Sequence, residues 1–165
     1  MLAQPITKDK YNQGSYVVYQ KLATDELWDG FKQRWYDRLA ARLRHGSTHL
    51  RDLSEVKQSG TTAQHDGGLQ VIPIRQIRGS EGRSAEFGPD FRPRGTQTRG
   101  RWISVARARQ DGQSLPPVEL VKVSDTYYVR DGNHRISVAA ALGQATVEAH
   151  VTEWKVADEA LPLAR

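Results

Sequence analysis

Residues 127 to 143 read YYVRDGNHRISVAAALG and place five polar or conformationally special residues between two apolar runs. The first run, Tyr127 to Val129, is typical of a strand. The second, Ile136 to Leu142, is alanine-rich and stops at Gly143, as helices commonly do. The stretch therefore predicts a strand, a tight turn and a helix, with the free amides of the helix at the carboxyl end of the strand.

The turn between these two elements has the residue types of an anion site. Gly132 permits a backbone conformation that other residues avoid and lets a ligand approach the main chain. Asn133 can cap the helix, while His134 and Arg135 add donors suited to phosphate oxygens. Cations at a helix N-terminus are unfavourable unless an anion is bound there. Asp131 could bind Mg²⁺, orient His134 or accept a substrate proton. The alternative is an Asp-Gly hairpin turn, which the helix-like run that follows argues against.

A second feature is an arginine-rich segment between Arg75 and Arg109. It holds nine arginines, no lysine and three acidic residues, so its net charge of +6 exceeds the +5 of the whole chain. Forked guanidinium groups favour phosphate or carboxylate recognition. The candidates for contact with nucleic acid or an acidic substrate are Arg78, Arg92, Arg94, Arg99 and Arg101, with Phe87, Phe91 and Trp102 interleaved. A solvated basic loop is the alternative interpretation.

The remaining pattern predicts one α/β (α+β) domain with a small mixed sheet. Residues 1–60 are expected to form an N-terminal helical extension, in which Leu27, Phe31, Trp35, Leu39 and Leu43 recur every four residues. Residues 57–68 have the composition of a linker, 69–154 form the main domain, and 155–165 form a short tail. Strands are predicted at 69–74, 118–123, 126–130 and 146–154, with a short helix around Trp102. The strand, helix and strand in residues 126–152 predict a right-handed βαβ unit with two parallel strands.

Composition limits the chemistry. The 165 residues contain no cysteine, which excludes disulfides, thiolate metal sites and cysteine nucleophiles. No apolar run approaches the ~20 residues of a membrane span, and the first residues lack the apolar core of a signal peptide. We therefore expect a cytoplasmic protein.

Three stretches together resemble the ParB/sulfiredoxin-like superfamily: VIPIRQIRGSEGR (71–83), the segment around LPPVELVKV (115–123), and YYVRDGNHRISVAAALGQATVEAHV (127–151). The resemblance covers about residues 69–152 and implies a nucleotide or phosphate site at the turn. Sulfiredoxins need a cysteine where this chain has Asn133, so their activity is excluded. Chromosome-partitioning proteins of this type bind CTP and DNA, and Arg135 and Arg83 match their phosphate-binding positions.

Free-serine kinases of the same superfamily carry the turn most similar to this one, Asp-Gly-His-His-Arg. Asp131, Gly132, His134 and Arg135 match it, and Asn133 departs from it. The resemblance implies Glu81 as general base, with Asp131 and His134 as the other candidate catalytic residues and Asp131 as the metal ligand. Other relatives with this turn are described as ParB-like nucleases.

We therefore expect a domain that binds phosphate or nucleotide and associates with DNA or RNA, in the manner of ParB-like DNA-binding or nuclease-like proteins. A small-molecule kinase that uses ATP or ADP is the first alternative, and a non-catalytic nucleotide sensor or scaffold is the second. The expected ligand is ATP, ADP or CTP with Mg²⁺. Whether a reaction is catalysed, and whether the chain forms a homodimer, stay open at this point.

Overall fold

A computed structural model of the chain describes residues 26, 28–30, 50–58 and 61–156. The elements, in chain order, are β1 (Arg51–Asp52), α2 (Leu53–Gln58), β2 (Thr61–Pro73), the 3-10 turn η1 (Ile74–Gln76), β3 (Ile77–Ser80), the 3-10 turn η2 (Thr96–Thr98), α3 (Arg99–Gln110), β4 (Val118–Val123), β5 (Thr126–Asp131), α4 (Asn133–Ala141) and β6 (Thr146–Val156). Within these residues, no helix is long and apolar enough to cross a membrane.

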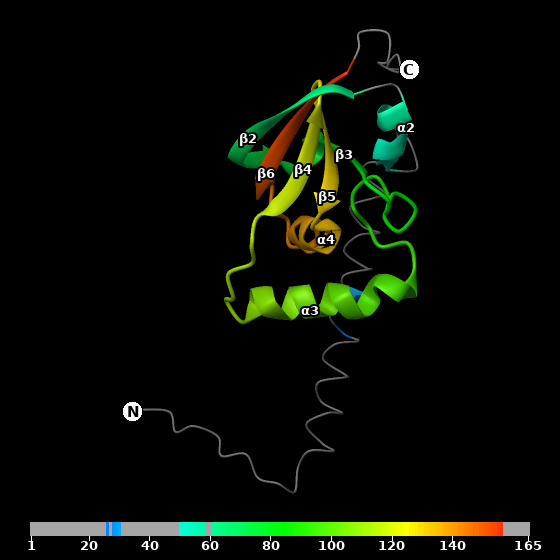
Figure 1. The fold of residues 1–165 in the computed structure, drawn as a ribbon. Coiled ribbons are helices and arrows are strands. Elements are labelled where there is room, and N and C mark those ends of the chain that lie inside the picture. The colour runs from blue at the N-terminus through cyan, green and yellow to red at the C-terminus, as the bar shows by residue number, and fades with distance from the viewer. Residues whose placement is uncertain (1–25, 27, 31–49, 59–60, 157–165) are drawn as a thin grey trace, which may run out of the picture.

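All six strands form one mixed sheet in the order β1-β3-β5-β4-β6-β2. β4 and β5 form the predicted hairpin, and β3 runs parallel to β5 on its other side. The predicted βαβ unit is wrong, because β4 lies between β5 and β6 and runs parallel to β6 but antiparallel to β5. After β5 the chain passes through α4 and returns to the sheet as β6 on the far side of β4, so β5 and β6 are antiparallel (Figure 1).

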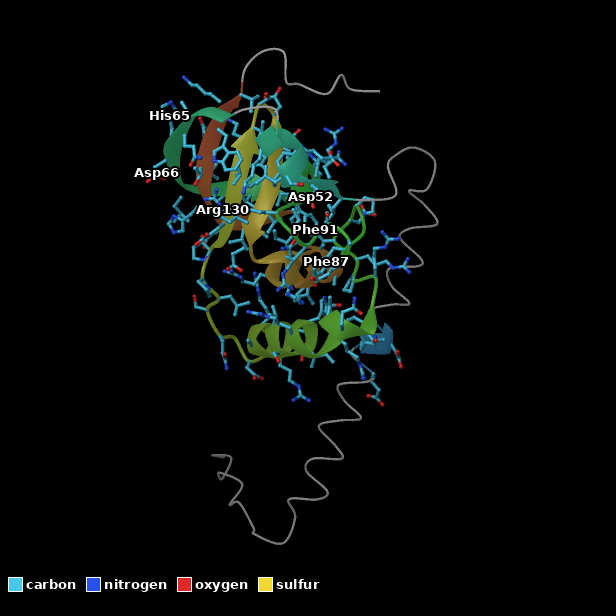
Figure 2. All side chains as sticks on the ribbon, turned by 45° about the vertical axis from the view of Figure 1, so that its right-hand side comes forward. Asp52, His65, Asp66, Phe87, Phe91 and Arg130 are labelled. Carbon is cyan, nitrogen blue, oxygen red and sulfur yellow. The ribbon has the colours of Figure 1, made fainter. Side chains whose placement is uncertain are left out.

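The strand β2 begins much earlier than its apolar residues indicate. It pairs with β6 from Thr61 to Pro73, with irregularities between Thr61 and Ala63 and between Asp66 and Gly68. Residues 61–68 therefore belong to the sheet, and their prediction as linker is wrong. His65 and Asp66 are exposed on this strand, at the outer edge of the sheet (Figure 2). Residues 61–68 are mostly polar and do not alternate between polar and apolar side chains, so their sequence does not indicate a strand.

Each face of the sheet is covered by a different helix. On one face, Ile136 and Ala139 of α4 pack with a cluster that includes Leu120 and Val129. On the other face, Leu53 and Val56 of α2 pack with a cluster of Val121, Val123, Tyr128 and Trp154. Successive residues of a strand point to opposite faces of a sheet. On β5, Tyr128 therefore packs in the cluster under α2, and its neighbour Val129 packs in the cluster under α4.

α3 forms a third layer below α4 (Figure 1). Trp102 of α3 is buried and donates its indole N–H to the Ser137 hydroxyl of α4 at 3.0 Å. Its ring also meets Trp28 edge-on, with centroids 5.5 Å apart. All five residues of the predicted N-terminal stripe, and most of the predicted helical extension, lie outside the described residues.

Candidate functional site

The turn between β5 and α4 has the local geometry that its sequence predicts. Gly132 is the N-cap residue of α4 and has φ 107° and ψ 18°. A Cβ atom built on it would lie 2.5 Å from Cγ1 of Val118, so both the backbone angle and the space require glycine. No side chain of a described residue caps the first amides of the helix. These amides, with the positive end of the helix dipole, are suited to hold an anion.

Asn133 does not cap the helix, contrary to its prediction. It is the first helical residue, and its side-chain oxygen accepts a hydrogen bond from the Ser80 hydroxyl at 2.9 Å. Both side chains are buried. The bond joins the end of β3 to the start of α4 and holds the turn beside the loop that follows β3.

Arg135 is turned toward the chain that leads into β4. Its guanidinium donates to the carbonyl oxygens of Pro116 and Pro117 at 2.6 and 2.7 Å and forms an ion pair with Asp131. These contacts differ from the predicted phosphate contact, since the donors are directed to the protein's own oxygens. Asp131 is likewise held by Arg135. Among the described residues, no group of three His, Cys, Asp or Glu side chains lies close enough to bind a metal ion.

His134, like Asn133, is a buried polar residue of the turn. Only 8% of it is exposed, and its Nε2 has no hydrogen-bond partner within the part of the chain that the structure describes. Its ring meets Phe87 edge-on at a centroid distance of 5.3 Å. Burial lowers the pKa of His134, and the charges of Arg83 and Arg101 lower it further, while Glu86 and Asp131 act in the opposite direction. Two arginines therefore direct positive potential at this histidine.

The depressed pKa of His134 predicts a loss of stability in acid. As pH falls below the ordinary histidine pKa of about 6.5, the unfolded chain takes up a proton before the folded chain does. We expect the free energy of unfolding to fall by up to about 1.4 kcal/mol per pH unit more in the parent than in His134→Leu. Urea titrations at pH 7, 6 and 5 measure this difference. Equal slopes for the two proteins would show that His134 titrates as it does in the unfolded chain.

Glu81 lies apart from the other candidate catalytic residues. Its carboxylate pairs with Lys57 of α2 and with Nε of Arg130 at 3.3 Å, on the face of the sheet that α2 covers. Lys57 and Arg130 also lie 5.6 and 5.7 Å from the ring of Trp154. The hydrogen bond from Lys57 is the main reason why the pKa of Glu81 is lowered. A carboxylate held in its charged form in this way is a weak base.

The loop after β3 is ordered by its aromatic residues. Phe87 and Phe91 are fully buried in the cluster that contains Ile136, and Figure 2 shows them next to α4. Phe87 forms an isolated bridge with Pro93, and Phe91 has φ 60°. The prediction that Phe87, Phe91 and Trp102 are interleaved with the arginines for contact with nucleic acid is wrong for these rings, because none is available to stack on a base.

The arginines of this segment fall into two groups. Arg78, Arg94 and Arg101 are exposed, and Arg83, Arg92 and Arg99 are half-buried. Arg83 forms an ion pair with Glu86 at 3.1 Å. The site thus brings together His134, the first amides of α4, Arg83 and Arg101. Sequence reasoning missed Ser80 and the carbonyls of Pro116 and Pro117, which have no motif of their own.

No family model matches the chain, and no curated protein matches it. Among solved structures, the chain is similar to sulfiredoxin from Arabidopsis thaliana, with 18% sequence identity and a TM-score of 0.38. The match covers 50% of this chain and 82% of that chain.

Proposed function

We propose that the chain binds the phosphate groups of a nucleotide at the N-terminus of α4. The observation that carries the proposal is Nε2 of His134, which is buried beside the first amides of α4 and has no hydrogen-bond partner among the described residues. A buried polar atom without a hydrogen bond costs about 1–3 kcal/mol, and a phosphate oxygen could supply the missing partner.

The charges around the turn support the same ligand. Arg83 and Arg101 both act electrostatically on His134, and the helix dipole adds positive potential. Phosphate oxygens accept charge-assisted hydrogen bonds from such groups. Arg135 contributes in another way, because it fixes the start of the helix against Pro116 and Pro117.

The residues of the site favour binding of a nucleotide without transfer of its phosphoryl group. A general base has to reach the hydroxyl that it deprotonates, and Glu81 is paired with Lys57 and Arg130 on the other face of the sheet. We therefore assign no reaction to the site and place the nucleotide sensor or scaffold ahead of the kinase.

Thermal-shift and calorimetric titrations with ATP, ADP, CTP, GTP and pyrophosphate, each with and without Mg²⁺, test the proposal. A ligand at 100 times its Kd stabilises the folded state by ~2.7 kcal/mol. We expect His134→Leu, which removes the donor and keeps an apolar body, to weaken binding about 10- to 100-fold. Glu81→Gln and the exposed His150→Leu should bind as the parent does. The proposal fails if His134→Leu keeps the parent affinity, or if none of the five compounds binds.

Association with nucleic acid is a second candidate function, favoured by the exposed guanidinium groups of Arg78, Arg94 and Arg101. Three phosphate contacts on duplex DNA predict a log–log salt slope of about −2.7. We expect Arg94→Gln to reduce that slope by about 0.9 for every DNA sequence tested. Anisotropy titrations between 25 and about 200 mM salt measure it, and a slope that Arg94→Gln leaves unchanged removes Arg94 from the interface.

A further inference from the structure

The two edges of the sheet differ in length and in protection. β1, at one edge, has 2 residues, whereas β2, at the other, has 13 and pairs with β6 alone among the described strands. Figure 1 shows β2 along the outside of the sheet. Proteins commonly shield an open edge strand with charged side chains, because its unpaired N–H and C=O groups can pair with another strand. Residues 67–73 of β2, GGLQVIP, contain no charged side chain.

The register of β2 shows which of its residues face outward. Ile74 donates its N–H to a carbonyl of the chain that leads into β6, at 2.9 Å, and so continues the pairing of the two strands. Because residues of an antiparallel strand face the neighbouring strand alternately, positions 70 and 72 also face β6. Leu69 and Val71 therefore direct their N–H and C=O groups away from the sheet. Pro73, which has no N–H, falls on an outward-facing position too, where proline is tolerated in a sheet.

The side chains of the same two residues are exposed. Leu69 is 59% exposed and Val71 is 63% exposed, and among the described residues Leu142 is the one other large hydrophobic residue that is exposed. Residues two positions apart in a strand lie on the same face. Leu69 and Val71 thus combine free main-chain groups with an apolar surface, which suits an added strand.

A second copy of β2, running antiparallel, satisfies these groups. When the two-fold axis passes at Gln70, Leu69 of each copy lies opposite Val71 of the other. Both residues face outward, so each of the two pairs exchanges two main-chain hydrogen bonds. The side chains of directly opposite residues lie on the same face, so the two pairs also form one apolar patch.

Charges at the two ends of this stretch favour a second copy as the partner. Asp66 precedes it and Arg75 follows it, and both are exposed. Figure 2 shows Asp66 at the outer edge of the sheet. The antiparallel arrangement places the Asp66 end of each copy beside the Arg75 end of the other, so that opposite charges meet twice.

We infer that two copies of the chain associate through β2 and join their sheets into one continuous sheet. The association is closed, because the remaining edge of each sheet is the short strand β1. The contact is small, and small interfaces are typical of weak, transient complexes, so the expected Kd is on the order of 100 µM. The inference does not depend on the proposed nucleotide site.

Sedimentation equilibrium of the full chain between about 5 and 500 µM tests this inference. We expect the parent to change from monomer to dimer across this range. Val71→Lys places a charge on the outward-facing edge and should remain a monomer throughout. Leu142→Lys, the matched control, changes an exposed apolar residue outside the strands in the same way and should dimerise as the parent does.

Amide hydrogen exchange, followed by NMR, locates the contact. The amides of Leu69 and Val71 should exchange quickly in dilute protein and slowly in concentrated protein. Those of Gln70 and Ile72, which face β6, should exchange slowly at both concentrations. The same spectra show whether each variant is folded.

A charge exchange tests the antiparallel arrangement. Asp66→Arg and Arg75→Asp should each weaken self-association about tenfold, because like charges would meet at both ends. An equimolar mixture of the two variants should associate as the parent does, since each end then pairs opposite charges.

Four results would overturn the inference: a monomeric parent at every concentration, a dimer of Val71→Lys, a dimer in which the Leu69 and Val71 amides stay unprotected, or a mixture that fails to restore association.

Discussion

Gly132→Ala is expected to lower the free energy of unfolding by about 2–5 kcal/mol. A non-glycine residue in the left-handed region costs about 1–2 kcal/mol, and forcing a methyl group into a packed site costs about 1–3 kcal/mol more. Both costs apply, because φ is 107° and the new Cβ would lie 2.5 Å from Val118. Whole-domain stabilities are only about 5–15 kcal/mol, so this is a large part of the total. Urea denaturation followed by circular dichroism measures the change.

Gly112→Ala is the matched control for this substitution. Gly112 also has a positive φ of 70°, but a Cβ atom there would meet nothing within 4 Å. Its cost should therefore be the conformational part alone, about 1–2 kcal/mol. If the two variants lose the same stability, the contact with Val118 contributes nothing and only the backbone angle matters.

Phe87→Ala should have the second large effect, a loss of about 3–5 kcal/mol, as is usual when a fully buried aromatic ring is removed. Phe87 has no exposed surface, packs in the cluster with Ile136 and meets the ring of His134. Its removal should free the loop that holds Arg83 near the turn. Chemical denaturation gives the stability, and the histidine ring signals in NMR report on the site.

Phe87→Leu separates the effect of Phe87 on stability from its effect on the pKa of His134. We expect it to cost about 1–2 kcal/mol and to leave the chain folded, so that the pKa of His134 can be followed. Less burial should raise that pKa toward the ordinary histidine value. The exposed Leu69→Ala should change stability by less than about 0.5 kcal/mol. A His134 pKa that stays as low in Phe87→Leu as in the parent would mean that Phe87 does not contribute to its desolvation.

Arg135 anchors the start of α4 to the carbonyl oxygens of Pro116 and Pro117. A variant of Arg135 would therefore disturb the position of the helix as well as any contact with a ligand. The test of the nucleotide site uses His134 for that reason.

Local sequence was sufficient for the elements that depend on neighbouring residues. The β4–β5 hairpin, the turn at Gly132 and the helix after it follow from alternation, glycine and helix-forming residues within about ten positions. The class of the fold, a mixed α/β sheet, follows from the same elements. The sequence also directs attention to His134, since a histidine in the first turn of a helix is unusual without an anion.

Only the tertiary structure decided which strands are neighbours and which side chains meet. β4 lies between β5 and β6, Phe87 and Phe91 are buried rather than exposed, and Glu81 is directed to Lys57 instead of His134. Each of these outcomes depends on contacts between residues far apart in the chain. Propensity and periodicity describe a residue's immediate neighbours, whereas strand order and burial result from how the whole sheet covers its apolar surface.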